Sequence, residues 1–272
     1  MTTATKQKKE EKSNATKTLN ISEHFYSVQG EGHSSGVPAY FIRLRGCNLM
    51  CGGPDGSLVK AGKATWWCDT EYVWRKGAKT SFDDIITSWQ ESDILDWVLK
   101  GRVHIVWTGG EPTLYKHQKD IVEFLTHLQS KFEDTIGRYR RPCFNEIETN
   151  GTQYIEDDLF GVTDQINCSV KLSNSGEPFE KRFCAIALRR IMSHPNYWFK
   201  FVISEEKDLE EIDEKFVTPL KIPAERVLMM PGLDSQKNYH ERTLFCMEMA
   251  KKYGYTGLTR LHVSAWDRTT GV

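Results

Sequence analysis

The strongest constraint on the fold is the alternation of short apolar runs with helical patterns along the chain. Helix signals include the capping-box sequence Ser81-Phe82-Asp83-Asp84, which begins a helix continuing towards Lys100, and the helical spacing of Ile121, Phe124 and Leu128. The expected strands are 40–44, 103–107, 143–148, 165–170, 198–203, 226–230 and 259–264. The expected helices also include 116–131, 179–193, 207–216 and 235–253.

Strands separated by helices of this length predict an α/β fold with a mostly parallel sheet and crossover helices. About six parallel strands are too few to close an eight-stranded barrel, so we expect a partial (open) TIM-like barrel. Functional residues of such sheets gather at the carboxyl ends of the strands. We expect one domain over 19–272, preceded by a disordered charged tail at 1–18.

Charge and cysteine content exclude several classes of protein. With 36 basic and 37 acidic side chains, the chain has no strong global field for holding a polyanion. No run approaches the roughly 18 apolar residues that span a bilayer, and the charged start lacks the apolar stretch of a secretory signal. We therefore expect the cytoplasm, where thiols stay reduced. Seven cysteines cannot form a fully paired disulfide framework.

Three cysteines fall in one short stretch after a predicted strand. Three residues separate Cys47 from Cys51, and sixteen separate Cys51 from Cys68. Turn-forming residues in an insertion at 52–66 allow Cys68 to return beside Cys51. Three thiolates and a fourth ligand would suit structural zinc, whereas three alone suit a [4Fe–4S] cluster with one open iron. The spacing does not choose between them. The remaining cysteines are expected in the core: Cys143, Cys168, Cys184 and Cys246.

Without the insertion, the cysteine loop reads CNLMC followed by WCDT, which resembles the CxxxCxxC loop of radical S-adenosylmethionine enzymes. Further segments are similar to one family in the same order: FYSVQGEG at 25–32, FIRLRGC at 41–47, TGGEP at 108–112, ETNGT at 148–152, and RLHV at 260–263 with Trp266. On these residues the chain is identified as a member of the 7-carboxy-7-deazaguanine synthase family, over residues 20–272. The long second gap between cysteines departs from the family pattern.

The resemblance implies a lyase reaction. A reduced [4Fe–4S] cluster cleaves S-adenosylmethionine, and the resulting 5′-deoxyadenosyl radical abstracts hydrogen from C6 of 6-carboxy-5,6,7,8-tetrahydropterin. The ring contracts and ammonia leaves, giving 7-carboxy-7-deazaguanine for queuosine or other 7-deazaguanine biosynthesis. The family also implies Mg²⁺, an external one-electron donor such as flavodoxin, and a homodimer, with no direct nucleic-acid or membrane partner.

The resemblance also assigns residues to the cofactors. Cys47, Cys51 and Cys68 would hold the cluster, and Thr70 would offer its hydroxyl to Mg²⁺, which prefers oxygen ligands. Because the cofactor carries the radical chemistry, no protein residue is expected to be catalytic in its own right. The implied S-adenosylmethionine contacts are Trp67, Asp69, Gly109, Gly110, Glu111, Glu148, Thr149, Asn150, Ser169, Lys171 and Ser173.

Substrate contacts are implied on neighbouring segments. The guanidinium of Arg43 would pair with the substrate carboxylate, as planar guanidinium groups do. His262 is expected to be a structural histidine in a strand. The full set of expected substrate contacts is Val28, Gln29, Gly30, Glu31, Arg43, Thr108 and the terminal carboxylate of Val272.

Two alternative functions remain open at this point. A glycyl-radical activating enzyme would share the CxxxCxxC and GGEP-like motifs, but the QGEG segment and the Cys-Asp-Thr sequence argue against it. A non-catalytic zinc module would need a fourth ligand, which the cysteine loop lacks.

Overall fold

The computed structural model describes residues 16–137, 143–232, 236–267, 269 and 271. Most of the expected charged tail and the expected substrate contact Val272 lie outside these residues. The first strand begins at Thr18. Because most of the tail lies outside the described residues, the division of the chain into a tail and one domain stays a prediction.

The described residues form one mixed sheet of nine strands in the order β3-β1-β2-β4-β5-β6-β7-β8-β9. From β2 to β9 all neighbours run parallel, whereas β1 pairs antiparallel with both β2 and β3. The strands are β1 Thr18–Val28, β2 Pro38–Leu44, β3 Ala78–Ser81, β4 His104–Gly109, β5 Asn145–Thr149, β6 Gln165–Val170, β7 Tyr197–Ile203, β8 Val227–Pro231 and β9 Thr256–Gly257. The expected mostly parallel, open α/β architecture is confirmed.

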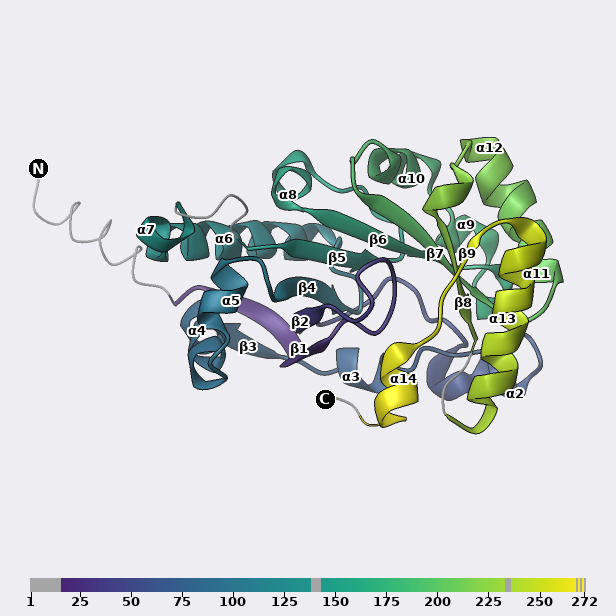
Figure 1. Cartoon of the computed structure of the whole chain (residues 1–272), viewed down its shortest axis with the longest axis horizontal. Coiled ribbons are helices and arrows are strands. Elements are labelled where there is room, and N and C mark those ends of the chain that lie inside the picture. The colour runs from purple at the N-terminus through teal and green to yellow at the C-terminus, as the bar shows by residue number, and fades with distance from the viewer. Residues whose placement is uncertain (1–15, 138–142, 233–235, 268, 270, 272) are drawn as a thin grey trace, which may run out of the picture.

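Helices surround the outside of the curved sheet, while the segment that carries α14 crosses its open side (Figure 1). The α-helices are α2 Ser57–Lys60, α3 Glu71–Trp74, α4 Phe82–Glu91, α5 Leu95–Leu99, α6 Tyr115–Lys131, α7 Glu133–Ile136, α8 Asp157–Val162, α9 Phe179–Arg182, α10 Ala185–Met192, α11 Lys207–Glu211, α12 Thr218–Leu220, α13 Tyr239–Tyr253 and α14 Leu261–Trp266. Short 3₁₀ turns lie at Pro54–Gly56, Ser173–Ser175, Ala224–Arg226 and Gln236–Asn238, and a π-helical segment at Ile212–Val217.

The predicted capping box at Ser81 is confirmed. The Ser81 hydroxyl accepts from the Asp84 amide at 3.0 Å, and the Asp84 carboxylate accepts from the Ser81 amide at 3.2 Å. The helix that starts here ends at Glu91, and a second helix, α5, ends at Leu99. The sequence pattern had predicted one continuous helix over both.

Two expectations about strands are wrong. The sequence pattern predicts no strand before residue 40, yet β1 is the longest strand described. The predicted strand at 259–264 is instead the start of α14, with Arg260 as its N-cap. Pairing with β8 stops after Gly257, and the Leu261 amide then donates to the Gly30 carbonyl at 2.9 Å. A run as short as Leu-His-Val does not distinguish strand from helix by periodicity.

The two faces of the sheet differ in polarity. Towards the helices, alternate residues are apolar, and Trp107 of β4 meets Phe124 of α6 edge to face at 5.6 Å between ring centroids. The other face of the same strands carries polar side chains, and these form the candidate site described below. Within the described ranges, no helix has the length and apolar character needed to cross a bilayer.

Candidate active site

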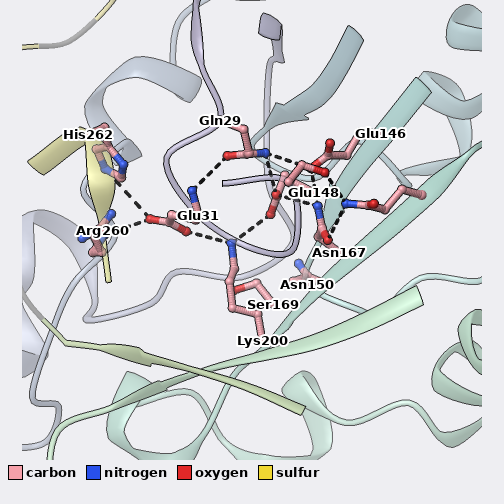
Figure 2. Close-up of polar contacts among 12 residues, drawn as sticks. Gln29, Glu31, Glu146, Glu148, Asn150, Asn167, Ser169, Lys200, Arg260 and His262 are labelled. Carbon is pink, nitrogen blue, oxygen red and sulfur yellow. Dashed lines mark hydrogen bonds and ion pairs between the residues drawn. The ribbon is translucent and has the colours of Figure 1, made fainter. Parts of the chain in front are cut away.

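Polar side chains project from alternate positions of adjacent parallel strands into the curve of the sheet (Figure 2). Period-2 alternation places them on one face, because successive residues of a strand point to opposite sides. They come from β5, β6 and β7 and are joined by residues of the loop after β1 and by the N-cap and first turn of α14. The members of this inner cluster are Gln29, Glu31, Glu146, Glu148, Asn167, Lys200, Arg260 and His262.

Two glutamates of β5 share the same pair of amide donors. The Gln29 side-chain amide donates to Glu146 Oε1 at 2.9 Å and to Glu148 Oε1 at 3.2 Å. The Asn167 amide donates to the same two oxygens, at 3.1 Å to Glu148. His104 lies 3.1 Å from the other oxygen of Glu146. The amides therefore hold two buried carboxylates close together without neutralising either.

Lys200 of β7 links this pair to the loop after β1. Its Nζ lies 2.7 Å from Glu31 Oε2 and 3.0 Å from Glu148 Oε2, and its side chain is only 4% exposed. A buried ammonium is costly unless it is paired, and here it contacts two carboxylates. One cation thus joins a strand of the sheet and a loop that crosses its inner face.

The C-terminal segment closes the cluster from the other side. Arg260 Nε donates to Glu31 Oε1 at 2.8 Å, and its terminal nitrogen lies 2.5 Å from Asp69 Oδ2. His262 lies 3.9 Å from Glu31. The His262 ring also packs against Gly30. A Cβ on residue 30 would lie 2.1 Å from His262 Nδ1, so only glycine fits there.

The neighbours of each glutamate set its charge. Burial raises the pKa of Glu148 to about 7, helped by Glu146 and Glu31 and opposed by Lys200. Burial acts the same way on Glu31, but Lys200, Arg260 and His262 together hold its pKa well below the usual range. Glu31 is therefore anionic at neutral pH, whereas Glu148 can exchange a proton there.

The cysteine loop follows β2 and lies beside the ends of β4 and β5. The Cys68 amide donates to the Cys51 carbonyl at 3.1 Å, so the insertion returns the third cysteine to the second, as expected. Trp74 Nε1 donates to Cys68 Sγ at 3.4 Å, and the Asn150 amide lies 3.8 Å from Cys47 Sγ. These donors would stabilise thiolates at both positions.

The thiols are close enough to influence one another electrostatically. Burial raises the pKa of Cys47 to about 12, with further contributions from Glu111, Cys51 and Cys68. Burial also raises the pKa of Cys51 to about 12, although the Lys171 ammonium opposes the rise. Buried thiols of this kind are poor nucleophiles, and a bound metal is what removes their protons.

The donor set of the cysteine loop consists of three free thiols. In the described part of the chain, no three His, Cys, Asp or Glu side chains are grouped so that they could hold one metal ion. An iron–sulfur cluster separates its thiolate ligands more widely than zinc does, since each thiolate binds a different iron. Three soft thiolate donors in one loop match the ligand set of a [4Fe–4S] group with one iron left open.

The insertion follows a fixed path over the loop after β6. The Gly52 amide donates to the Ser175 carbonyl at 2.7 Å, and the Thr65 amide donates to the Asn174 carbonyl at 2.9 Å. The Trp66 indole donates to the Asn174 side chain at 2.8 Å. Both ends of the insertion are therefore held by one turn, which returns the chain to Cys68.

The TGGEP segment is bound to the start of the cysteine loop. The Gly110 amide donates to the Leu44 carbonyl at 3.0 Å, and the Glu111 amide donates to the Gly46 carbonyl at 2.8 Å. A Cβ on Gly109 would lie 2.3 Å from the backbone of Leu44. The glycines are thus required by the approach of two backbone segments, whatever else they contact.

Sequence comparison finds relatives that cover most of the chain. The chain is 30% identical to the 7-carboxy-7-deazaguanine synthase of Pyrobaculum aerophilum over 261 residues, which cover 94% of this chain and 99% of that protein. It is 28% identical to the enzyme of the same name from Halobacterium salinarum, covering 92% and 91% of the two chains. The chain belongs to the 7-carboxy-7-deazaguanine synthase family.

A solved structure supports the fold. The crystal structure of QueE from Escherichia coli superposes with a TM-score of 0.58 at 23% identity, covering 90% of this chain and 95% of that one. No family model matches the chain.

Glu111, expected to contact S-adenosylmethionine, is fully buried and already bonded within the 7-carboxy-7-deazaguanine synthase fold. Its Oε1 accepts from the Thr113 amide at 2.9 Å and from the Thr149 hydroxyl at 2.7 Å. Its Oε2 accepts from the backbone amide of Asn150 at 2.7 Å. This geometry favours a role for Glu111 in joining the ends of β4 and β5.

Asn150 connects this junction to the cysteines. Its side-chain amide donates to Asn48 at 3.0 Å, and its oxygen accepts from the Thr152 amide at 3.0 Å. The ETNGT turn therefore lies against the cysteine loop.

The expected serine-lysine segment is only partly brought together. Lys171 Nζ donates to Ser169 at 2.7 Å and lies 5.6 Å from the centre of the Trp66 ring, near Cys51. The Ser173 hydroxyl instead donates to Glu211 Oε2 at 2.6 Å. Trp67 is 45% exposed and lies over Gly52.

Thr70 lies beside Cys68, and Arg43 lies on β2, the strand that leads into the cysteine loop. Thr70 is the N-cap of α3 without a capping side-chain bond, and its Oγ1 lies 3.5 Å from Cys68 Sγ. Arg43 pairs with Glu23 at 2.8 Å and faces the same side as Asp69, whose pKa it helps to lower. Thr108 of β4 is the neighbour of Arg43 across the β2–β4 pair. Val28 is the last residue of β1.

Lys200, Asn167 and Glu146 were not among the expected site residues. A signal for Lys200 was present in the sequence, since it interrupts the apolar run Trp198-Phe199-Lys200-Phe201. Asn167 lies at an alternate position between Ile166 and Cys168, whereas Glu146 lies in the mainly polar strand β5. A charged residue in a strand that is buried on both faces needs a partner inside the protein. This pattern predicts a polar inner face that includes Lys200 and Asn167.

The remaining cysteines follow the prediction with one exception. Cys143, Cys168 and Cys246 are buried, at 7%, 0% and 0% exposure. Cys184 is only partly buried, because it lies at the N-cap of α10 and not inside a helix.

Proposed function

We propose that this chain converts 6-carboxy-5,6,7,8-tetrahydropterin to 7-carboxy-7-deazaguanine, with loss of ammonia, as a radical S-adenosylmethionine lyase. The observation that carries this proposal is the link between the cysteine loop and the inner cluster of carboxylates and amides. Asp69, directly after Cys68, pairs with Arg260, which in turn pairs with Glu31. A ring system rich in N–H donors needs such acceptors, and radical chemistry needs a site enclosed by protein.

The [4Fe–4S] cluster would be held by Cys47, Cys51 and Cys68. When bound, it supplies the electron that cleaves S-adenosylmethionine. The protein itself binds and orients the cofactors and the substrate and excludes water. Asn150 and Trp74 donate hydrogen bonds towards the thiolates. Lys171 places a positive charge near Cys51, where a methionyl carboxylate would find a partner.

The substrate would lie between the cysteine loop and the inner cluster. Arg43 is half-buried on the inner face and would receive the substrate carboxylate. Gln29, Glu31 and Glu148 present acceptor oxygens and one amide to the pterin edge. Thr108 and Val28 border the same space, and the carboxylate of Val272 would complete it.

Mg²⁺ would bind at the Thr70 hydroxyl. That hydroxyl does not cap α3, so it is available as an oxygen ligand. Mg²⁺ retains several waters and needs few protein ligands, and the substrate carboxylate would supply another oxygen.

We also propose that an external one-electron donor reduces the cluster, that the enzyme is a homodimer, and that it works in the cytoplasm. Cluster assembly requires reduced cysteines, which suits that compartment. The product would enter queuosine or another 7-deazaguanine pathway.

Anaerobic reconstitution tests the proposal against the zinc alternative. We expect a brown protein with about four irons per chain, which forms methionine and 5′-deoxyadenosine from S-adenosylmethionine after reduction. A colourless protein that binds one zinc per chain and leaves S-adenosylmethionine intact would refute it.

A further inference from the structure

Lys200 joins a carboxylate of the sheet, Glu148, to a carboxylate of the loop after β1, Glu31. Within the described residues, its Nζ is 2.7 Å from Glu31 and 3.0 Å from Glu148. Figure 2 shows its side chain rising from β7 to a point between the two carboxylates. Neither the family motifs nor the expected contacts include it.

Charge counting shows why this ammonium matters. Three glutamates of the cluster, Glu31, Glu146 and Glu148, lie among neutral amides and two strong cations, Lys200 and Arg260. Arg260 reaches Glu31 but bonds on its other side to Asp69. Lys200 is therefore the direct counter-ion of Glu148.

Geometry points to positioning as well as charge. Glu31 lies in a loop, and loops keep a fixed conformation only where tertiary contacts hold them. Lys200 stands on the middle of a parallel strand flanked by the buried rings of Phe199 and Phe201. A rigid strand thus fixes a carboxylate that belongs to a less regular segment.

We propose that Lys200 is a positioning residue that holds Glu31 and Glu148 as a fixed pair of anionic acceptors for the N–H groups of the pterin. This inference rests on the proposed function, because it takes the pterin as the ligand. Lys200 acts through the two carboxylates and need not touch the substrate itself.

The groups facing Glu148 determine how binding depends on pH. They are Lys200 from β7, Glu31 from the loop after β1 and Glu146 from β5, with Arg260 and His262 acting through Glu31 and His104 acting through Glu146. Lys200 lowers the pKa of Glu148 and the other carboxylates raise it. Removing the ammonium should therefore shift the protonation of Glu148 to higher pH.

The experiment measures binding of 6-carboxypterin to cluster-loaded enzyme with S-adenosylmethionine, by calorimetry between about pH 6 and pH 9. Lys200→Met should weaken binding at neutral pH by about tenfold or more, and should move the midpoint of the pH profile upward. Lys200→Gln keeps a hydrogen-bond donor and should show the same upward shift. Lys207→Met, at an exposed position, is the matched control and should bind like wild type.

Lys200→Arg separates charge from position. The arginine keeps the positive charge, so the pH midpoint should stay near that of wild type, while the wider guanidinium weakens binding by about threefold or more. If the methionine and glutamine variants do not fold, this variant decides the matter, and unchanged binding by Lys200→Arg contradicts the positioning role.

The outcomes also separate this inference from the proposed function. Wild-type enzyme that neither binds the probe nor converts the pterin contradicts the proposed function. Wild-type enzyme that does both, with folded Lys200→Met and Lys200→Gln variants whose pH midpoints are unchanged, contradicts only the role of Lys200.

Discussion

Gly110 lies so close to Gly46 that a Cβ on Gly110 would stand 1.7 Å from the Gly46 carbonyl oxygen. This contact joins the turn after β4 to the residue directly before Cys47. The position of the first cysteine therefore depends on a glycine more than sixty residues away in the sequence.

Gly110→Ala should separate these two segments. Overpacking against backbone cannot be relieved by a rotamer change, so we expect a loss of at least about 3 kcal/mol in the free energy of unfolding, together with reduced iron after reconstitution. Urea unfolding and iron analysis measure both. Gly161→Ala, where a Cβ would meet nothing within 4 Å, is the control and should retain wild-type iron content.

The cysteines should divide into ligands and core residues. Cys68→Ala should abolish cluster assembly, because a cluster with one open iron has no spare thiolate. Cys246→Ala, in the apolar core, should leave the iron content unchanged. Iron and sulfide analysis after anaerobic reconstitution distinguishes them, and an iron requirement for Cys143 or Cys168 would overturn the ligand assignment.

Glu111→Gln should disrupt the junction between β4 and β5. An amide in place of the carboxylate directs N–H donors at the donors of Thr113, Thr149 or Asn150. We expect a loss of about 2 to 4 kcal/mol in the free energy of unfolding, since a buried donor is left unsatisfied. Glu214→Gln at an exposed position should change it little. Equal urea midpoints for both variants would show that Glu111 is not structural.

Glu148 should make stability depend on pH. Its pKa is raised from 4.5 to about 7 in the folded protein, so between these values the native state holds more protons than the unfolded state. The contribution of Glu148 to the free energy of unfolding therefore falls as the pH rises through this window, by on the order of 3 kcal/mol. Glu148→Gln removes this dependence.

Urea unfolding of both proteins at several pH values measures the effect. The stability of wild type relative to Glu148→Gln should decline from about pH 4.5 to pH 7. A difference that stays constant across this range would show that Glu148 has an ordinary pKa in the folded chain.

Much of the fold followed from local patterns. Apolar runs broken by single polar residues, such as 198–203, predicted buried strands, and the capping box at Ser81 marked a helix start. The C-terminal motif was assigned the wrong secondary structure, because the contact between Leu261 and Gly30 that begins α14 joins residues distant in sequence.

In the site, too, residues within local motifs were predicted, whereas residues placed by contacts between distant segments were not. Short motifs located the cysteines, Gly110 and Glu31, since each such residue lies in a recognisable local sequence. Lys200 and Asn167 lie in strands without a motif, and their role comes from neighbours on other strands. The sequence also could not indicate that the Glu111 carboxylate would be occupied by Thr113, Thr149 and Asn150.

The central claim is tested most directly by the products formed from 6-carboxy-5,6,7,8-tetrahydropterin. Reduced, cluster-loaded enzyme with S-adenosylmethionine and Mg²⁺ should form 7-carboxy-7-deazaguanine and ammonia in equal amounts, as measured by mass spectrometry and an ammonia assay. Absence of both products from protein that retains its cluster and cleaves S-adenosylmethionine would contradict the account.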